Sequence, residues 1–130
     1  MKIATYVCLN GNCEEAVDYY QKLFNATLIR KTLFEDYMTD KKELVGKIFH
    51  AELLIKGFYL YFSDSLDVYD YANQAYKITM ECDTLEEAET YFDALKKGGV
   101  VNEDFKKLPW GMYMGNVRDR FDVTWDIVFC

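Results

Sequence analysis

A repeat with an offset of 72 residues constrains the fold of this chain more than any other feature of its sequence. Residues 12–24 and 84–99 both carry apolar side chains at helical spacing, which predicts two amphipathic helices. Helix propensity alone produces some matches between such segments, so agreement of their flanks is the stronger evidence for a repeat. The matched pairs are Glu14/Glu86, Glu15/Glu87, Ala16/Ala88, Tyr19/Tyr91, Tyr20/Phe92 and Leu23/Leu95.

The flanks of the two predicted helices agree as well. Each helix follows one strand-like run and precedes three more. We therefore expect an α+β fold of two βαβββ modules, at about residues 1–65 and 75–130, linked by residues 64–74. A length of 130 residues suits a single domain over 1–130. The predicted strands are residues 3–10, 26–34, 47–55 and 58–63 in the first module and 75–82, 100–107, 111–118 and 123–129 in the second.

Both predicted helices begin at a residue suited to capping. Asn12, with Glu15 three residues later, is close to a capping box. Thr84 and Glu87 repeat this arrangement in the second module. The glycine pair at 98–99 is expected to end the second helix.

Lys56 and Gly57 predict a two-residue hairpin turn. Such a turn pairs residues whose numbers sum to 113. Because side chains alternate along a strand, the paired strands then have one apolar and one polar face. The apolar face consists of Ala51, Leu53, Ile55, Phe58, Leu60 and Phe62, and the polar face carries His50, Glu52, Leu54, Tyr59, Tyr61 and Ser63.

Alternation also separates two faces in the second module. Asp126 leaves the apolar side that holds its neighbours Trp125 and Ile127, and Lys77 alternates with apolar residues of its own strand. An antiparallel sheet can simply expose its polar face to water. Tyr59 and Tyr61, on the polar face of the first module, favour a ligand-binding cleft instead.

Composition and charge exclude several classes of partner. A formal charge of −7 and isolated lysine doublets disfavour nucleic acid. Every apolar stretch is far shorter than the roughly 20 residues of a membrane span, and residues 10–11 break the apolar start of the chain. We therefore expect a cytoplasmic protein without a membrane partner. The four cysteines have no CxxC spacing and are expected to be reduced thiols.

Nearly the whole chain resembles PhnB-like proteins of the vicinal oxygen chelate superfamily, which includes glyoxalases, bleomycin-resistance proteins and dioxygenases. The resemblance rests on NGNCEEAVDYYQKLFNATL, KIFHAELLIKG, FSDS and WGMYMGNVRDRFDVTWDI, in this order. It implies paired modules that form a curled, cup-like mixed sheet with helices on the outer face, usually in a homodimer. The polar face would line the cup. Asp122 departs from the pattern, which usually has Gly after D-R-F.

The resemblance also implies four metal-ligand positions, one on each of four strands. They fall at Thr5, at about Tyr61, at Lys77 and at Asp126. Only Asp126 is a good metal ligand, and Lys77 places a cation where a second ligand belongs. We expect no tightly bound metal at these positions.

The single histidine leaves several roles open. His50 with Glu52 and Asp126 would form a one-histidine metal site, and His50 between Ser63 and Asp64 would form a hydrolase triad. No G-x-S-x-G elbow supports the triad. His50 would also suit a lone general base partnered by Glu52 or Tyr61, or a hydrogen-bonded sheet histidine without a catalytic role.

No glycine-rich phosphate cradle is present, and nothing resembles a cofactor loop for methyl transfer, although some relatives carry a methyltransferase name. Trp125 is expected in the core, whereas Trp110 either rims the cleft or has a structural role.

These residues predict a protein that binds a small organic ligand without an obligatory metal, with catalytic residues unknown. The alternative is a metal-dependent lyase, isomerase or dioxygenase. The predicted ligand-binding residues are His50, Glu52, Tyr61, Ser63, Lys77, Trp110 and Asp126.

Overall fold

The computed structural model describes residues 1–37, 42–65 and 76–130, and the chain divides into two compact units, Met1–Tyr69 and Asp70–Cys130. No helix within the described ranges is long and apolar enough to cross a membrane. All four cysteines are thiols, two buried and two exposed. Most of the predicted link between the modules (residues 64–74) lies outside the described residues, from residue 66 on.

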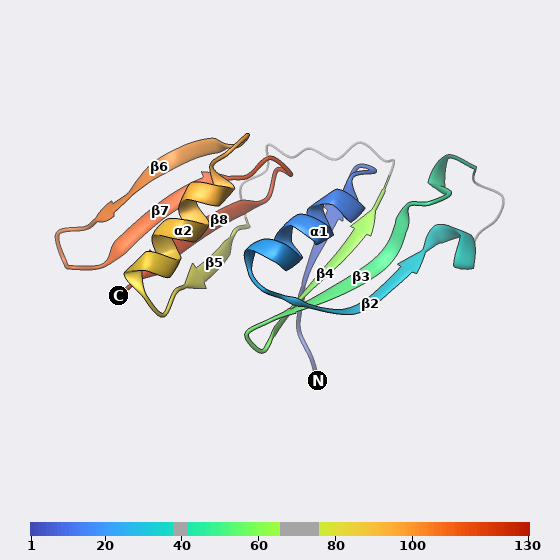
Figure 1. Cartoon of the computed structure of the whole chain (residues 1–130), viewed down its shortest axis with the longest axis horizontal. Coiled ribbons are helices and arrows are strands. Elements are labelled where there is room, and N and C mark those ends of the chain that lie inside the picture. The colour runs from blue at the N-terminus through green and yellow to red at the C-terminus, as the bar shows by residue number, and fades with distance from the viewer. Residues whose placement is uncertain (38–41, 66–75) are drawn as a thin grey trace. The chain divides into compact units, whose positions relative to one another are not determined.

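The first unit has the predicted βαβββ order (Figure 1). Its sheet has the strand order β1-β4-β3-β2, with β1 parallel to β4 and the other pairs antiparallel. Helix α1 packs on β3 and β4. The elements are β1 (Thr5–Leu9), α1 (Cys13–Leu23), β2 (Thr27–Leu33), the short 3₁₀ turns η1 (Phe34–Asp36) and η2 (Lys42–Leu44), β3 (Ile48–Ile55) and β4 (Phe58–Asp64).

The second unit repeats this topology, which confirms the predicted pair of modules (Figure 1). Its strand order is β5-β8-β7-β6, with β5 parallel to β8, and α2 packs on β7 and β8. The elements are β5 (Ile78–Glu81), α2 (Leu85–Leu95), β6 (Val100–Lys107), β7 (Tyr113–Arg118) and β8 (Thr124–Phe129).

The two modules contribute separate sheets. Within the described residues, each sheet has four strands and neither contains a strand of the other unit. The prediction of one curled sheet is therefore corrected to two mixed sheets, neither of which curls strongly by itself (Figure 1). A helix covers one face of each sheet, because it carries the chain from the first strand of the unit across the sheet to the second strand at the opposite edge.

The predicted hairpin register is confirmed. All five pairs between β3 and β4, from Ala51/Phe62 to Ile55/Phe58, have residue numbers that sum to 113. Ala51, Leu53 and Phe62 are fully buried beneath α1, where Tyr20 stacks on Phe62 with 5.8 Å between ring centroids. Burial of each large side chain stabilises the fold by about 1.5–3 kcal/mol. The apolar face of the alternation therefore forms the core of this unit.

Helix α1 is capped from another strand. Asn12 makes no side-chain capping hydrogen bond, so the predicted Asn12–Glu15 capping box is wrong. The buried carboxylate of Asp64, at the end of β4, accepts hydrogen bonds from Cys13 N at 2.9 Å and Ile48 N at 3.0 Å. Asp64 therefore ties the start of the helix and the start of β3 to the end of β4.

We expect Asp64→Asn to lower the free energy of unfolding by about 2–4 kcal/mol, because a charged acceptor of two buried N–H groups is lost and an amide N–H₂ faces one of them. Urea denaturation of the purified variant measures this. Asp18→Asn, an exposed change on α1, is the matched control and should shift stability by less than about 0.5 kcal/mol. An Asp64→Asn protein as stable as wild type would contradict this role for Asp64.

Helix α2 uses the cap that the sequence predicts. The Thr84 hydroxyl accepts a hydrogen bond from Glu87 N at 3.1 Å, and Glu87 Oε2 accepts one from Asp83 N at 3.0 Å. The chain leaves the helix through Gly98, whose φ of +75° is a left-handed conformation that glycine adopts without strain. The predicted start and end of this helix are both confirmed.

The core of the second unit is built around Trp125, as predicted. Its side chain is fully buried, and Nε1 donates a 2.9 Å hydrogen bond to the buried carboxylate of Asp119. The same carboxylate accepts hydrogen bonds from Phe121 N and Val123 N and so holds the turn before β8. Asp122 within this turn has a φ of +65°. The departure from glycine at position 122 therefore places a non-glycine residue in a left-handed conformation.

We expect Asp122→Gly to raise the free energy of unfolding by up to about 1 kcal/mol, because glycine adopts a positive φ without a Cβ penalty. The exposed Arg118–Asp122 ion pair, at 3.7 Å, contributes little that would offset this gain. Asp122→Ala is the matched comparison and should be less stable than wild type. Equal urea midpoints for the Gly and Ala variants would show that the backbone is not strained at this position.

Candidate functional site

The polar face of the first sheet, opposite α1, gathers the predicted residues of the first module with one that was not predicted. Strand pairing places Tyr6 beside Tyr61, Tyr61 beside Glu52, and Glu52 beside Arg30. These four residues form a row across β1, β4, β3 and β2. His50 lies in the next row, beside Thr32.

A chain of two hydrogen bonds crosses this face. The Tyr6 hydroxyl lies 2.7 Å from His50 Nδ1, and His50 Nε2 lies 3.1 Å from Glu52 Oε1. The side chains of His50 and Glu52 are 22% and 12% exposed, whereas Tyr6 is 47% exposed. His50 therefore contacts Glu52, one of the two partners considered for it, and Tyr6 is an additional partner.

The ionisation of Glu52 and Tyr6 follows from these contacts. The hydrogen bond from His50 lowers the pKa of Glu52, with the charges of Arg30 and Lys2 acting in the same direction against partial burial. Burial raises the pKa of Tyr6, against a hydrogen bond with the Ser63 hydroxyl that lowers it. At neutral pH this face therefore presents a carboxylate and a protonated phenol on either side of the imidazole.

Aromatic rings surround the imidazole. Tyr61 lies edge-on to both Tyr6 and His50, with centroid distances of 5.9 and 5.2 Å. Lys2 Nζ lies 3.4 Å from the centroid of the Tyr59 ring, a cation–π contact. The face therefore offers flat apolar surface together with phenolic hydroxyl groups and a positive charge.

The hydrolase arrangement of Ser63, His50 and Asp64 is wrong. The Asp64 carboxylate is buried beneath α1 and accepts backbone hydrogen bonds there, on the opposite face of β4 from Ser63. Ser63 Oγ donates to the Asp64 carbonyl oxygen at 3.1 Å. Alternation along β4 therefore separates the nucleophile from the acid.

In the second unit, Lys77 and Asp126 form an ion pair. Lys77 Nζ lies 2.8 Å from Asp126 Oδ2, and the Asn116 amide donates a hydrogen bond to Asp126 Oδ1. Asp126 is 5% exposed, and its hydrogen bond to Lys77 raises the pKa of that ammonium group. Both oxygens of the Asp126 carboxylate are therefore already engaged by protein donors.

Trp110 lies in the turn between β6 and β7 and is 72% exposed, so it is not a core residue. Lys77, Trp110 and Asp126 belong to the second unit, and the remaining predicted ligand-binding residues belong to the first. A site that joins both sets, including the trio of His50, Glu52 and Asp126, stays a prediction.

The four metal positions implied by the resemblance do not fit a metal. Thr5 pairs with the buried Leu60 and so points to the α1 side of the sheet, away from Tyr61. Lys77 already neutralises Asp126. Throughout the described ranges, no three His, Cys, Asp or Glu side chains lie close enough together to hold a metal ion. The side chains at these positions therefore do not suit a metal ion, because Lys77 is positively charged and Thr5 points to the other side of the sheet.

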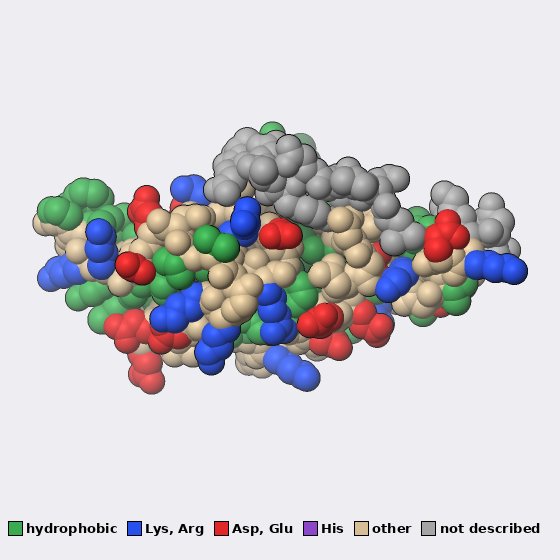
Figure 2. Space-filling view, turned by 90° about the horizontal axis from the view of Figure 1, so that it is seen from above, with side chains coloured by type: hydrophobic (Ala, Val, Ile, Leu, Met, Phe, Trp, Pro, Cys, Tyr) green, Lys and Arg blue, Asp and Glu red, His purple; other side chains and the backbone are tan. Residues whose placement is uncertain are grey.

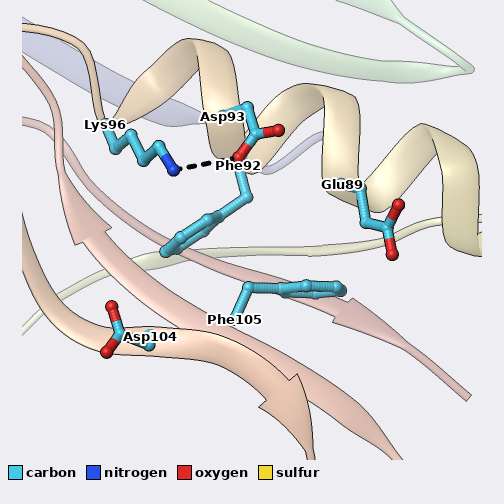
Figure 3. A pocket seen from close by; sticks show the side chains of 6 residues that line it. All are labelled: Glu89, Phe92, Asp93, Lys96, Asp104 and Phe105. Atoms are coloured by element: carbon cyan, nitrogen blue, oxygen red, sulfur yellow. Dashed lines mark ion pairs between the residues drawn. The ribbon is translucent and has the colours of Figure 1, made fainter.

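A groove of about 290 Å³ lies between α2 and β6. Phe92 and Phe105 pack together inside it with 5.7 Å between centroids, and Lys96 pairs with Asp93 at 3.1 Å (Figure 3). Gly115 permits this packing, since a Cβ there would lie 2.7 Å from Phe92 Cε2. Three carboxylates against one lysine make the groove acidic. It contains none of the predicted site residues. The residues that line it are Glu89, Phe92, Asp93, Lys96, Asp104 and Phe105.

Charged side chains of both signs are interspersed on the face of the molecule shown in Figure 2. Lysine and arginine do not gather there into one basic patch. The formal charge of the whole chain is −7.

A family model described as 3-demethylubiquinone-9 3-methyltransferase matches residues 1–128. The chain belongs to this family. Protein PA1353 from Pseudomonas aeruginosa has 32% sequence identity and a TM-score of 0.88, covering 99% of this chain and 97% of that chain. A putative 3-demethylubiquinone-9 3-methyltransferase, PhnB protein, from Bacillus cereus has 23% identity and a TM-score of 0.86, covering 100% of both chains.

The fold of the family extends to the wider superfamily. A glyoxalase/bleomycin resistance protein/dioxygenase family enzyme from Burkholderia phytofirmans PsJN has a TM-score of 0.68 at 12% identity, covering 97% of this chain and 95% of that chain. The predicted resemblance to PhnB-like proteins is confirmed, and the chain has the superfamily fold of two βαβββ modules.

Sequence reasoning missed Tyr6, Arg30 and Lys2 on the polar face of this family member. Alternation within residues 3–10 already separates Tyr6 and Cys8 from Val7 and Leu9. The missing information was the parallel pairing of β1 with β4, which brings Tyr6 beside Tyr61 and within reach of His50. No local pattern specifies that register.

We expect Glu52→Gln to alter the pH dependence of stability. Because the pKa of Glu52 is lower in the folded chain, its carboxylate stabilises the fold above the unfolded value of about 4.3, and this contribution is lost as the pH falls through the folded pKa. The difference in Tm between wild type and Glu52→Gln should therefore be constant above about pH 5 and shrink at lower pH. Thermal melts from pH 7 to pH 2.5 measure it, and a difference independent of pH would contradict the pairing with His50.

Proposed function

We propose that this protein binds a small, partly apolar organic molecule on the polar face of the first sheet, without an obligatory metal. The observation that carries the proposal is the Tyr6–His50–Glu52 chain of hydrogen bonds among tyrosine rings. Ring faces bind planar or apolar groups, and a few convergent polar atoms orient a ligand. His50, Glu52, Tyr61 and Ser63 are the ligand-contacting residues of this proposal in the first unit.

In the second unit, Lys77, Trp110 and Asp126 are proposed as ligand-contacting residues. The exposed indole of Trp110 suits stacking on a planar ligand. The Lys77–Asp126 pair supplies a donor and an acceptor of opposite charge. A role in sequestering a harmful small molecule is one version of this function. The expected cytoplasmic location and the expected lack of nucleic-acid and membrane partners stay predictions.

The absence of an obligatory metal is part of the proposal and is supported by the donor chemistry. A divalent metal needs several N, O or S donors directed at one point. Here Lys77 places a positive charge against Asp126, and Thr5 points away from Tyr61. Metal analysis of protein purified without chelator should therefore find none at stoichiometric level. Stoichiometric nickel, zinc, manganese or iron would contradict the proposal and favour a metal-dependent lyase, isomerase or dioxygenase.

Ligand binding is tested by thermal-shift screening of a broad small-molecule library. A ligand present at 100 times its Kd stabilises the fold by about 2.7 kcal/mol, which raises Tm by several degrees. His50→Ala should abolish the shift, whereas the exposed change Glu43→Ala should leave it intact. A library that produces no shift in the wild-type protein would favour a structural or interaction role over ligand binding.

We further propose that the chain forms a homodimer, as the resemblance to PhnB-like proteins implies. Apolar side chains on the outer strands of both sheets, Ile29 on β2 and Val100 on β6, are 44% and 50% exposed and would suit burial against a second copy. Light scattering coupled to size-exclusion chromatography should give about twice the chain mass of 15.3 kDa. A mass of one chain at all concentrations would contradict the dimer.

A further inference from the structure

We propose that Glu52, His50 and Tyr6 form a proton relay in which the Tyr6 hydroxyl is a general base toward a ligand with an acidic C–H bond. This inference rests on the proposed ligand site and adds a reaction to it. It is carried by two hydrogen bonds in series, from Glu52 Oε1 to His50 Nε2 at 3.1 Å and from His50 Nδ1 to the Tyr6 hydroxyl at 2.7 Å.

The chemistry of the three groups gives the relay one direction. A carboxylate only accepts hydrogen bonds, so His50 Nε2 must carry the proton that it shares with Glu52. Nδ1 of the neutral ring then has a free electron pair, and the Tyr6 hydroxyl donates to it. The lowered pKa of Glu52 and the raised pKa of Tyr6 agree with this distribution of protons.

Exposure increases along the relay and leaves one end accessible. Glu52 and His50 are 12% and 22% exposed, whereas Tyr6 is 47% exposed. As in the Ser-His-Asp triad, a carboxylate orients an imidazole that accepts the proton of a hydroxyl group. Here the hydroxyl is a phenol that takes a proton from the ligand in return, instead of attacking it as a nucleophile. Within the relay, Tyr6 is the group placed to reach the reacting C–H bond, and His50 and Glu52 act on that bond through it.

The groups around Tyr6 suit a planar carbon acid that becomes an anion. The Tyr61 ring is edge-on to Tyr6 with 5.9 Å between centroids and provides a wall for a planar group. The Lys2 ammonium lies 5.4 Å from the Tyr61 centroid, and Arg30 pairs in register with Glu52. Besides these two cations, the titratable groups near the relay include Tyr61, whose ring contacts Tyr6 and His50, and the thiols of Cys8 and Cys13. Both positive charges act on Glu52, so the face on which a negative ligand charge would develop carries positive charge.

The proposed step is a proton transfer that balances without a co-reactant. The Tyr6 oxygen takes the proton from carbon as the Tyr6 proton moves to His50 Nδ1, so the C–H bond breaks and a new O–H bond forms. The electron pair stays on the ligand, delocalised into an adjacent carbonyl group as an enolate. The imidazolium is held by the Glu52 carboxylate. Return of the proton to another carbon gives an isomer.

The proton distribution is tested directly because the chain has one histidine. Two-dimensional ¹H–¹⁵N NMR of the wild-type protein, at a pH where His50 is neutral, gives one pair of imidazole nitrogen signals. We expect the proton on Nε2 and an unprotonated Nδ1. A proton on Nδ1, or a mixture of the two tautomers, would overturn the relay. A histidine with a purely structural role requires neither tautomer in particular.

General-base activity is tested with 5-nitrobenzisoxazole, a planar probe whose ring opens when a base removes its C–H proton. Tyr6→Phe should lower the rate by about 10²-fold or more, the range typical of a lost general base. Tyr37→Phe, an exposed tyrosine outside the relay, is the matched control and should react like wild type. A wild-type rate no higher than that of Tyr6→Phe overturns the proposal.

A loss of rate in His50→Gln without a loss in Tyr6→Phe would also overturn it, since the imidazole would then be the base. Failure of the relay is distinguishable from failure of the proposed function. If ligands still raise Tm in a His50-dependent manner while Tyr6→Phe keeps the wild-type rate, binding stands and the reaction does not.

Discussion

The parallel pairing of the first and last strands in each unit makes the other features of the structure possible. Such a pair needs a crossover connection, which here begins with the helix that carries the chain from β1 to β2, or from β5 to β6, at the opposite edge of the sheet. The crossover places a helix on one face of the sheet, so that alternating side chains form a core on that face and a polar surface on the other. In the first unit the same pairing brings Tyr6 beside Tyr61 and within 2.7 Å of His50.

The two modules share this topology but differ in how they satisfy buried polar groups. Asp64 caps α1 from the end of β4, whereas Thr84 caps α2 from its own N-terminus. The polar faces differ as well. The first carries a hydrogen-bonded chain that ends at an exposed phenol, and the second holds the closed ion pair of Lys77 and Asp126. The repeated topology therefore supports two faces with different chemistry, of which the first is better suited to act on a ligand.

Family membership and site chemistry support different parts of the functional argument. The match over residues 1–128 establishes the family and the fold, but a shared fold supports many unrelated reactions. The side chains at the positions implied for a metal say more about function than the family match does, because Lys77 and Thr5 cannot act as metal ligands there. Acid–base chemistry at Tyr6, His50 and Glu52 needs no such donors, and it uses atoms that are already in hydrogen-bond contact.

The sequence by itself determined the repeated βαβββ order, the hairpin register at Lys56–Gly57, the core position of Trp125 and the cap of α2, because each depends on spacing within a short segment. Contacts between distant segments were decided only by the tertiary structure. Asp64 caps α1 from 51 residues beyond Cys13, and the hydrogen bond between Tyr6 and His50 joins residues that are 44 positions apart. No local sequence pattern predicts either contact. Such contacts depend on which strands become neighbours and in what register, and helical or strand periodicity carries no information about either.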